Sequence, residues 1–450
     1  MLLNFSIENF ASIGIKQTIN LINGKARGKN EHLIKCYNKN ILKFSSIYGA
    51  NASGKTTMIK AMNFGKKVIG NGYFDKRYMS TNRSNDTWLE KPTEFIYTVF
   101  IDNKIYEYGF SLLWSMQRII KEWLIEQNSR DIRQTIFLRD FISNDFNITI
   151  KYKSVEQQNR IQMYFNDASK ETNKLFLNDI NSGKGNLFTD YPSLQYLQSI
   201  YRWFVTKLKF VYPNNDATDL GAYSFLNHFD NNVDIIKYLD ELGIPITNMK
   251  YIDISKEKAF KDIEYEVIQK VEEDIIKTHR KLGNNDTASI IMRTNEEYFI
   301  IEVNSEGFQN IKTVEFTHSE YGTYEYKEES DGTRRLLELL EILTSPEDGI
   351  TYIVDELDRS LHPLLTEQFI LKYLELDKQK NRQLIITTHE SRLLNLNHLR
   401  KDEIYFSTNK KGESEFVRLD EYENGNARAD VNIEVAYLRG RYNAIPNFIK

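Results

Sequence analysis

Alternating apolar and polar residues predict β-strands over much of the first 130 positions. The alternating runs are residues 2–10, 15–22, 94–102, 104–113 and 118–127. Asp102 and Asn103 separate two of these runs, and this dipeptide suits a tight turn between paired strands. The sequence therefore predicts a sheet-rich N-terminal lobe over residues 1–150.

Apolar residues recur at helical spacing after residue 150. Residues 194–211, 233–242 and 257–282 carry this pattern, so a helical insert is expected over residues 151–285. The 257–282 helix is too short and irregular for a long coiled coil, and its mixed charges favour a solvated face over a binding surface. Strand patterns return at 289–294, 297–303 and 312–318, which predicts a C-terminal lobe over residues 286–450.

Length and composition narrow the class of protein. A chain of 450 residues exceeds one ordinary core, so two or three domains are expected, with one of them inserted into another. Hydrophobic residues make up 41% and charged residues 27%, values typical of a folded protein. The net charge of −4 argues against a chain coated in positive charge for nucleic acid, although a local basic patch is compatible with it.

Cysteine usage and hydropathy indicate the setting. Cys36 is the only cysteine, which excludes an intrachain disulfide and a zinc site built from cysteines of this chain. This usage fits a reducing, cytoplasmic compartment. The N-terminal residues resemble a strand rather than a signal peptide. The sequence contains no run of 18 apolar residues, so a membrane span is not expected.

Residues 49–57 (GANASGKTT) match the phosphate-binding P-loop and lie between a strand-like run, 42–48, and a helix-like run, 56–62. Glycines let successive N–H groups turn inward around a polyphosphate, and the helix N-terminus adds positive potential. Lys55 would reach the β- and γ-phosphates of ATP, and the Thr56 hydroxyl would hold Mg²⁺. The alternative is a glycine-containing turn that binds nothing. The candidate nucleotide-binding residues of the loop are Gly49, Asn51, Ser53, Gly54, Lys55, Thr56 and Thr57.

Two adjacent carboxylates follow an apolar run far downstream. Residues 349–354 (GITYIV) predict a buried strand that ends at Asp355 and Glu356. Ligands of α/β sheets bind at the carboxyl ends of such strands. Asp355 would belong to the Mg²⁺ shell, and Glu356 would orient or deprotonate the attacking water. The pair alone could equally mark a strand end or a helix cap, but the P-loop favours the catalytic interpretation.

Two further segments complete a candidate site. His389 follows the next strand pattern (RQLIITTHE), where a neutral imidazole could relay a hydrogen bond to the γ-phosphate. Ser330 is a natural N-cap before an apolar helix pattern, and Gly332 permits close backbone approach. As local structure these are a surface histidine and a well-capped helix. A second phosphate-facing helix start nevertheless suggests that Ser330 faces the nucleotide of another subunit.

These elements, in this order, resemble the ABC-type ATPase heads of the SMC and RecF kind. The resemblance implies an α/β P-loop head that dimerises around ATP, with residues 49–57 as Walker A and Asp355 and Glu356 as Walker B. It further implies a signature loop at residues 330–333, a D-loop at 358–360 and a switch histidine at His389. Asp331 departs from the pattern, because a glycine is common there, and this bears on the strength of head engagement. Gln117 and Gln127 are available as the Q-loop glutamine, without a choice between them.

The segments EFIYTVFIDNKIYEYGFSL, EESDGTRRLLEL, VDELDRSLHPLL and YLRGRYNAIPNF resemble the prokaryotic AAA/ABC-type ATPases of anti-phage systems, including the PARIS, Septu and RloA-like groups. The resemblance covers essentially the full length. It implies a defence role beside a separate effector protein, often a nuclease, with a phage component or a nucleic acid as trigger. The chain itself shows no nuclease pattern. Related defence ATPases can carry a C-terminal Toprim module, but the roughly 60 residues after His389 are too few for a domain of typical size.

The sequence thus predicts a Mg²⁺-dependent ATPase that forms a homodimer or higher homo-oligomer through its heads and controls an effector. Two other functions fit the same motifs. One is a RecF-like repair or recombination ATPase that acts directly on DNA. The other is a nucleotide-gated scaffold that binds ATP with negligible turnover. The basic stretch 202–209 could face nucleic acid, but an ordinary basic helix face is the simpler explanation.

Overall fold

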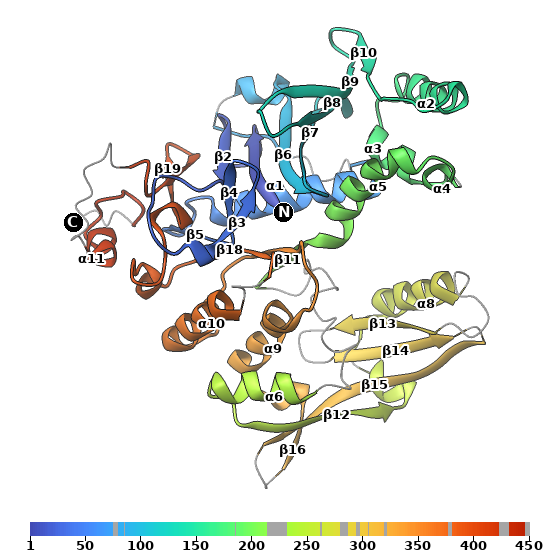
Figure 1. The fold of residues 1–450 in the computed structure, drawn as a ribbon. Coiled ribbons are helices and arrows are strands. Elements are labelled where there is room, and N and C mark those ends of the chain that lie inside the picture. Colours follow the sequence, from blue (N-terminus) through green and yellow to red (C-terminus); the bar gives the residue numbers. More distant parts are fainter. Residues whose placement is uncertain are drawn as a thin grey trace. The chain divides into compact units, whose positions relative to one another are not determined.

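A computed structural model gives the fold of the chain (Figure 1). It describes residues 1–74, 80–84, 86–184, 186–213, 232–261, 263–279, 287–293, 298–304, 306–318, 322–376, 380–422 and 432–445. Two compact units are present. Unit 1 comprises Met1–Val211, Glu347–Asp358 and Ile370–Lys450, and unit 2 comprises Tyr212–Pro346 and Arg359–Phe369. This partition differs from the three segments predicted above, whose boundaries stay a prediction.

The N-terminal part of unit 1 contains a seven-stranded antiparallel sheet of order β10-β9-β8-β7-β6-β1-β2. Its strands are β1 (Leu2–Glu8), β2 (Gln17–Asn20), β6 (Thr93–Ile101), β7 (Lys104–Leu113), β8 (Arg118–Gln127), β9 (Arg133–Asp140) and β10 (Asp145–Ile148). Asp102 and Asn103 have φ values of 49° and 58°, the left-handed pair that a two-residue hairpin requires. The predicted strands and their turn are therefore confirmed.

The second sheet of unit 1 carries the P-loop and has the order β11-β17-β18-β5-β19-β20. The strands are β5 (Phe44–Gly49), β11 (Leu208–Val211), β17 (Thr351–Val354), β18 (Gln383–Thr388), β19 (Ile404–Lys410) and β20 (Glu413–Arg418). All neighbouring pairs are parallel except β19 with β20. Every residue of β5, β17 and β18 is buried, which explains their continuous apolar runs. The predicted α/β class is confirmed.

Helix α1 (Lys55–Asn71) follows the P-loop and packs against the seven-stranded sheet. The Tyr97 hydroxyl of β6 donates to the Met62 carbonyl at 2.7 Å. Gly65 makes this approach feasible, because a Cβ there would overlap the Tyr97 hydroxyl. At the other end of α1, the Asn178 amide donates to the carbonyls of Ile69 and Gly70. The helix is thus fixed along its length within unit 1.

The remaining elements of unit 1 are short. They are β3 (Leu33–Cys36), β4 (Lys39–Leu42), α2 (Val155–Ala168), α3 (Phe176–Asn181), α4 (Leu187–Asp190), α5 (Gln195–Arg202) and α11 (Ile433–Leu438). Single turns lie at η1 (Asn30–His32), η2 (Asp86–Glu90), η3 (Pro192–Leu194), η4 (Trp203–Lys207, a π-helical turn), η9 (Ser391–Leu393) and η10 (Lys401–Glu403). Helix α10 (Pro363–Leu376) begins in unit 2 and ends in unit 1.

One predicted helix is wrong at its C-terminal end. Residues 194–211 were expected to form a single helix, but α5 and η4 stop at Lys207 and β11 follows. Strand β11 pairs in parallel with β17, from Leu208 opposite Thr351 to Val211 opposite Val354. The apolar residues of this stretch are compatible with either element, and pairing at the sheet edge decides for a strand. The segment expected as a helical insert also contains β12 (Ile246–Ile254), so it is not wholly helical.

Unit 2 has its own sheet, of order β12-β15-β14-β13, with β16 paired to β15. The other strands are β13 (Thr287–Arg293), β14 (Tyr298–Asn304), β15 (Gly307–His318) and β16 (Thr323–Glu325), and the helices are α6 (Asn232–Glu241), α7 (Lys256–Ala259), α8 (Tyr265–His279), α9 (Asp331–Thr344) and the turn η7 (Tyr326–Glu328). Ala259 and Val271 from the α7–α8 region pack with Phe299, Ile301 and Ile311 of the sheet. The predicted charged helix over residues 257–282 is confirmed only in part, because α7 ends at Ala259 and a separate helix, α8, runs from Tyr265 to His279. Residues 262 and 280–286 lie outside the described part.

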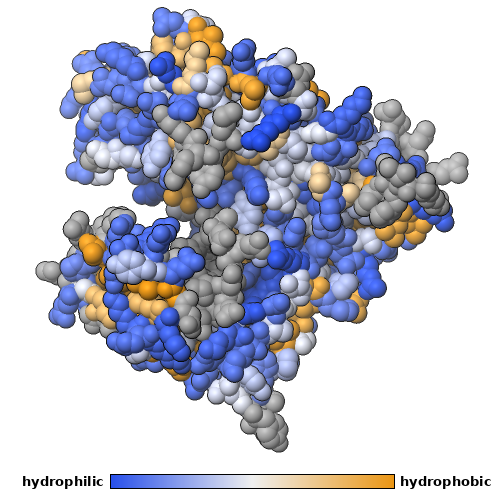
Figure 2. Space-filling view, turned by 180° about the vertical axis from the view of Figure 1, so that it is seen from behind, coloured by the Kyte–Doolittle hydropathy of each residue, from blue (hydrophilic) through white to orange (hydrophobic). Residues whose placement is uncertain are grey.

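The visible surface is mainly polar. On the face drawn in Figure 2, hydrophilic side chains predominate and hydrophobic ones form small, separate groups. Among the described helices, none combines the length and apolar composition needed to cross a bilayer.

A buried amide joins the seven-stranded and the six-stranded sheet of unit 1. Gln383, at the start of β18, is fully buried, and its Oε1 accepts from the Leu2 amide at 2.7 Å and from Thr351 Oγ1 at 2.9 Å. Its Nε2 donates to the carbonyls of Leu2 and Leu42 at 2.8 and 3.0 Å. All four hydrogen-bonding positions of the amide are therefore satisfied, as burial of a polar group requires.

Replacing Gln383 by Leu should destabilise unit 1. The substitution leaves several buried backbone groups without partners, and the expected loss is about 3 kcal/mol of unfolding free energy. Urea denaturation measures it, with Gln158→Leu as the control because Gln158 is an exposed residue of α2. Equal denaturation midpoints for the two variants would show that the Gln383 amide does not join the sheets.

Candidate functional site

The P-loop turns on two left-handed residues. Ala52 has a φ of 62° and Gly54 a φ of 104°, and α1 begins at the next residue. A Cβ on Gly54 would overlap the Ser414 side chain, and a Cβ on Gly49 would overlap the Ser407 hydroxyl. Glycine is therefore required at both positions for space, and at Gly54 also for the backbone angle. The helix N-terminus and the turned backbone form a concave, anion-attracting loop.

Lys55 holds a buried positive charge on this loop. Its Nζ donates to the carbonyls of Gly49 at 2.7 Å and Ala50 at 3.1 Å, and the residue is only 5% exposed. Burial lowers the pKa of Lys55 to about 8, while the negative charges of Asp355, Glu356 and Asp358 oppose that shift. The ammonium thus lies within electrostatic reach of three carboxylates from a distant part of the sequence.

A threonine fixes the Asp355 carboxylate and the backbone of Glu356. Thr387 Oγ1 of β18 donates to Asp355 Oδ1 at 2.6 Å and accepts from the Glu356 amide at 2.8 Å. Asp355 is 1% exposed, and its amide donates to the Val211 carbonyl. Glu356 has a φ of 48°, a strained angle for a residue with a side chain. Both carboxylates therefore stand at the carboxyl end of β17 in a backbone geometry set by β18.

His389 follows β18 at the same edge of the sheet. Its amide donates to the Asp358 carboxylate at 3.2 and 3.3 Å. Burial and the Lys55 charge lower the pKa of the imidazole below its ordinary 6.5, against the opposing charges of Asp358, Glu356 and Asp355. A lowered pKa makes the imidazole neutral at pH 7, so it can both donate and accept hydrogen bonds.

Hydroxyl groups surround the P-loop. Ser53 Oγ is 2.6 Å from Ser407 Oγ of β19, and Ser12 Oγ donates to Thr57 Oγ1 at 3.2 Å. Ser12 Oγ also lies 2.7 Å from Ser414 Oγ of β20. Thr56 is half-buried and Asn51 is exposed. Ser12, Ser407 and Ser414 are site residues that the sequence patterns missed, since no spacing marks them.

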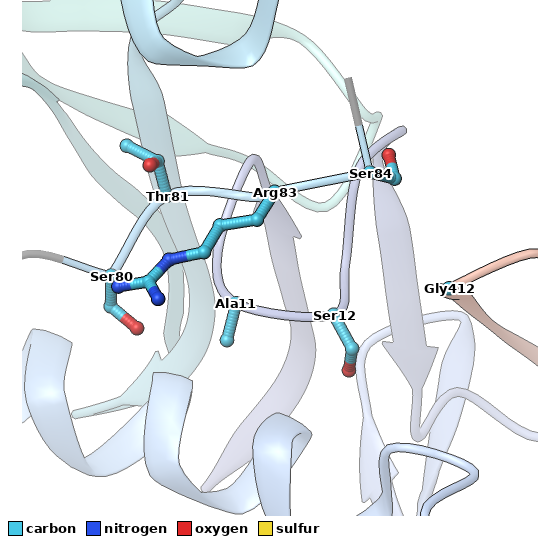
Figure 3. A pocket seen from close by; sticks show the side chains of 7 residues that line it. All are labelled: Ala11, Ser12, Ser80, Thr81, Arg83, Ser84 and Gly412. Atoms are coloured by element: carbon cyan, nitrogen blue, oxygen red, sulfur yellow. The ribbon is translucent and has the colours of Figure 1, made fainter. Parts of the chain in front are cut away.

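A pocket of about 440 Å³ opens beside the start of α1 (Figure 3). It is lined by Ala11, Ser12, Ser80, Thr81, Arg83, Ser84 and Gly412. In Figure 3 the Arg83 side chain extends across the pocket toward Ser80. Four of these residues, Ser80, Thr81, Arg83 and Ser84, come from the segment 80–84. Its run of hydroxyl residues beside an arginine is the signal that could have identified it, and residues 75–79 and 85 lie outside the described part.

The predicted signature residues belong to unit 2. Ser330 caps α9, because its Oγ accepts from the Thr333 amide at 3.1 Å. A Cβ on Gly332 would lie 2.9 Å from the Ser360 carbonyl oxygen, so glycine permits this close contact. The N-cap prediction is confirmed. Asp331 is exposed and pairs with the Arg334 guanidinium.

The two candidate Q-loop glutamines stay unassigned. Gln127 Nε2 donates to Asp131 Oδ1 at 2.7 Å, and Gln117 lies in the connection between β7 and β8 with a φ of 52°. Within the described part of the chain, neither side chain has a hydrogen bond to residues 49–57.

The arrangement brings together residues from three distant stretches of unit 1. The P-loop follows β5, Asp355 and Glu356 follow β17, and His389 follows β18, all at the carboxyl edge of one parallel sheet. A buried ammonium, carboxylates and a neutral imidazole on an anion-attracting loop suit the binding of a phosphate ester and attack on it by water.

Comparison with known proteins gives a family match and several similar solved structures. The family model described as "AAA domain, putative AbiEii toxin, Type IV TA system" matches residues 44–395. No curated protein matches the chain. Similar solved structures include an SMC head bound to the C-terminal winged-helix domain of ScpA, with 15% identity and a TM-score of 0.40 over 94% of this chain and 99% of that one.

Two more SMC heads give similar values. An SMC head with an extended coiled coil, bound to the C-terminal domain of ScpA derived from Pyrococcus furiosus, has 14% identity and a TM-score of 0.38 over 94% of this chain and 97% of that one. The SMC head domain from Thermotoga maritima has 11% identity and a TM-score of 0.34, with 93% and 98% covered. The family match, by contrast, runs from β5 through the P-loop, both carboxylates and His389. The chain belongs to this family of AAA domains.

Proposed function

We propose that the chain is a Mg²⁺-dependent ATPase that works as a homodimer of heads, or a higher homo-oligomer, and controls a separate effector in anti-phage defence. The observation that carries the ATPase part is the buried Lys55 ammonium on the P-loop, within electrostatic reach of Asp355 and Glu356. A buried cation beside fixed carboxylates is suited to the triphosphate and its developing charge.

The P-loop and the pocket beside it together suit a nucleoside triphosphate. Phosphates would lie on residues 49–57, and the pocket beside α1 would receive the base, since Ser12 both lines that pocket and bonds to Thr57. The pocket supplies hydroxyl groups and one guanidinium, Arg83, which can lie over the face of a purine. Hydroxyl groups can donate and accept hydrogen bonds, so they suit the edge of adenine, which carries both donors and acceptors.

The residues present also fit a magnesium ion. Thr56 and Asp355 would hold it, because a hydroxyl and a carboxylate supply the oxygen ligands that Mg²⁺ prefers. Mg²⁺ would take its other ligands from phosphate and water, as it usually does in nucleotide sites. When bound, the ion would neutralise phosphate charge.

The protein side chains divide the chemical work. Glu356, whose backbone Thr387 fixes, would orient and deprotonate the attacking water. The neutral imidazole of His389 would donate a hydrogen bond to the γ-phosphate, and Lys55 would balance its negative charge. Ser330 would come from the partner subunit. Its Oγ accepts from the Thr333 amide at 3.1 Å and lies 2.9 Å from Thr333 Oγ1, so the Ser330 hydroxyl could donate to phosphate when Thr333 Oγ1 is the donor in that second contact.

The defence role rests on the family. The description of the family names a putative AbiEii toxin and a type IV toxin–antitoxin system, which supports a part in abortive infection. The protein would act in the cytoplasm. A phage component or a nucleic acid would serve as the infection trigger and change whether the heads hold ATP. This change would make the heads hold or release the effector. A RecF-like repair ATPase predicts salt-sensitive binding of gapped duplex DNA by the isolated chain. A nucleotide-gated scaffold predicts ATP binding without phosphate release.

Lys55→Ala should weaken ATP binding by about 100-fold, because the variant loses charge-assisted hydrogen bonds to the phosphates. Equilibrium binding of a fluorescent ATP analogue measures this loss. Lys60→Ala is the matched control, since Lys60 is an exposed lysine one turn further along α1. Retained affinity in Lys55→Ala would remove residues 49–57 from the nucleotide site.

Glu356→Gln should lower phosphate release by about 100-fold while leaving ATP binding intact, because the amide cannot take a proton from water. The variant should therefore accumulate as an ATP-bound dimer, which mass photometry with and without Mg-ATP detects. Glu375→Gln, at an exposed position of α10, is the control. A Glu356→Gln protein that turns over ATP normally, or stays monomeric with Mg-ATP, contradicts the assigned base.

A further inference from the structure

The C-terminal segment, residues 432–445, packs against the nucleotide site of unit 1. Tyr437 of α11 lies with its ring centroid 6.1 Å from that of Tyr48, the residue directly before Gly49 of the P-loop. Tyr442 stacks on Phe406 of β19 at 4.3 Å with an angle of 7° between the rings. Tyr48 and Phe406 are fully buried, and Tyr442 is buried as well. Residues 432–445 therefore pack against the carboxyl end of β5, directly before the P-loop.

The aromatic contacts lead directly to P-loop atoms. Phe406 also stacks on Tyr437 at 5.5 Å, and the next residue, Ser407, has its Oγ 2.6 Å from Ser53 Oγ of the P-loop. The Tyr422 hydroxyl donates to the backbone carbonyl of Tyr442 at 3.0 Å and so helps to hold Tyr442 in place. Two rings of the C-terminal segment thus hold the strand that supports Ser53.

A polar contact reaches the segment that follows His389. Ser391 Oγ donates to Glu434 Oε1 at 2.8 Å, and Glu434 belongs to α11. Ser391 begins the turn η9, in which Leu393 and Leu394 are buried. On its other side, the His389 amide donates to Asp358. His389 therefore lies between two carboxylate tethers, one from the loop after β17 and one from the C-terminal segment.

We propose that Glu434 is a positioning residue for His389, and that the C-terminal segment thereby completes the ATPase site. The inference rests on the proposed function, because it assumes that His389 contacts the γ-phosphate. Glu434 is not the N-cap of α11, because the Asn432 side chain accepts the capping hydrogen bond from the Val435 amide. Its carboxylate instead holds the residue two positions after the histidine. A displacement of about 1 Å at a reacting group can cost roughly 100-fold in rate.

The test compares four variants of the full chain with a fifth, control variant. Glu434→Ala should lower kcat for phosphate release by about tenfold with an ATP Kd within about twofold of wild type, since the phosphates still bind residues 49–57. Glu434→Gln should restore kcat, because its Oε1 can still accept from Ser391. Ser391→Ala should reproduce the loss, and the double variant should be no worse than either single one. Val435→Ala, at a residue 41% exposed on the same helix, is the control.

A second readout does not depend on turnover. The imidazole ¹H–¹³C resonance of His389, assigned with His389→Gln, should shift in Glu434→Ala and return in Glu434→Gln. An unshifted resonance, or a loss of turnover that merely follows a loss of thermal stability, overturns the positioning role. A shifted resonance in a protein whose wild type releases no phosphate instead overturns the proposed ATPase and leaves the positioning of His389 intact.

Discussion

The buried charge of Lys55 is the constraint on which the rest of the site depends. An ammonium with 5% exposure loses most of its hydration, and this burial lowers its pKa to about 8. Two loop carbonyls and the nearby carboxylates of Asp355, Glu356 and Asp358 compensate for the lost water. The P-loop must therefore assemble together with the strand that supplies the carboxylates. The same holds for His389, which is influenced by the Lys55 charge and by the carboxylates. An isolated P-loop helix would have no means to keep this cation buried.

Sheet register provides that assembly. Parallel pairing of β17 with β18 and of β18 with β5 brings the carboxyl ends of the three strands to one edge. One hydroxyl, that of Thr387, then fixes Asp355 and the Glu356 backbone together. At the opposite end of β18, Gln383 connects the same strand to β1 of the antiparallel sheet. Strand β18 thus carries a structural connection at its first residue and the site geometry at its last ones.

The sequence predicts the parts of this site that local chemistry defines. Gly54, Lys55 and the Asp355–Glu356 pair follow from motif spacing and from the rule that ligands collect at carboxyl strand ends. Ser12, Ser407, Ser414 and Thr387 are missed, because their roles arise only when strands distant in sequence become neighbours. Strand β11 is misread for the same reason: only its pairing with β17 distinguishes it from the end of a helix. The motif at 437–448 is recognisable from sequence, but the contact of Glu434, which precedes it, with Ser391 is not, and residues 446–448 lie outside the described part.

The central claim is that one active site takes its P-loop from one subunit and Ser330 from another. Mixing two inactive chains, Lys55→Ala and Ser330→Arg, tests it most directly through steady-state phosphate release. Each variant alone should be inactive, yet an equal mixture should recover about a quarter of wild-type turnover, because about half of random dimers are mixed and each keeps one intact site. A mixture as inactive as its folded components, or full activity of Ser330→Arg by itself, would contradict a site shared between subunits.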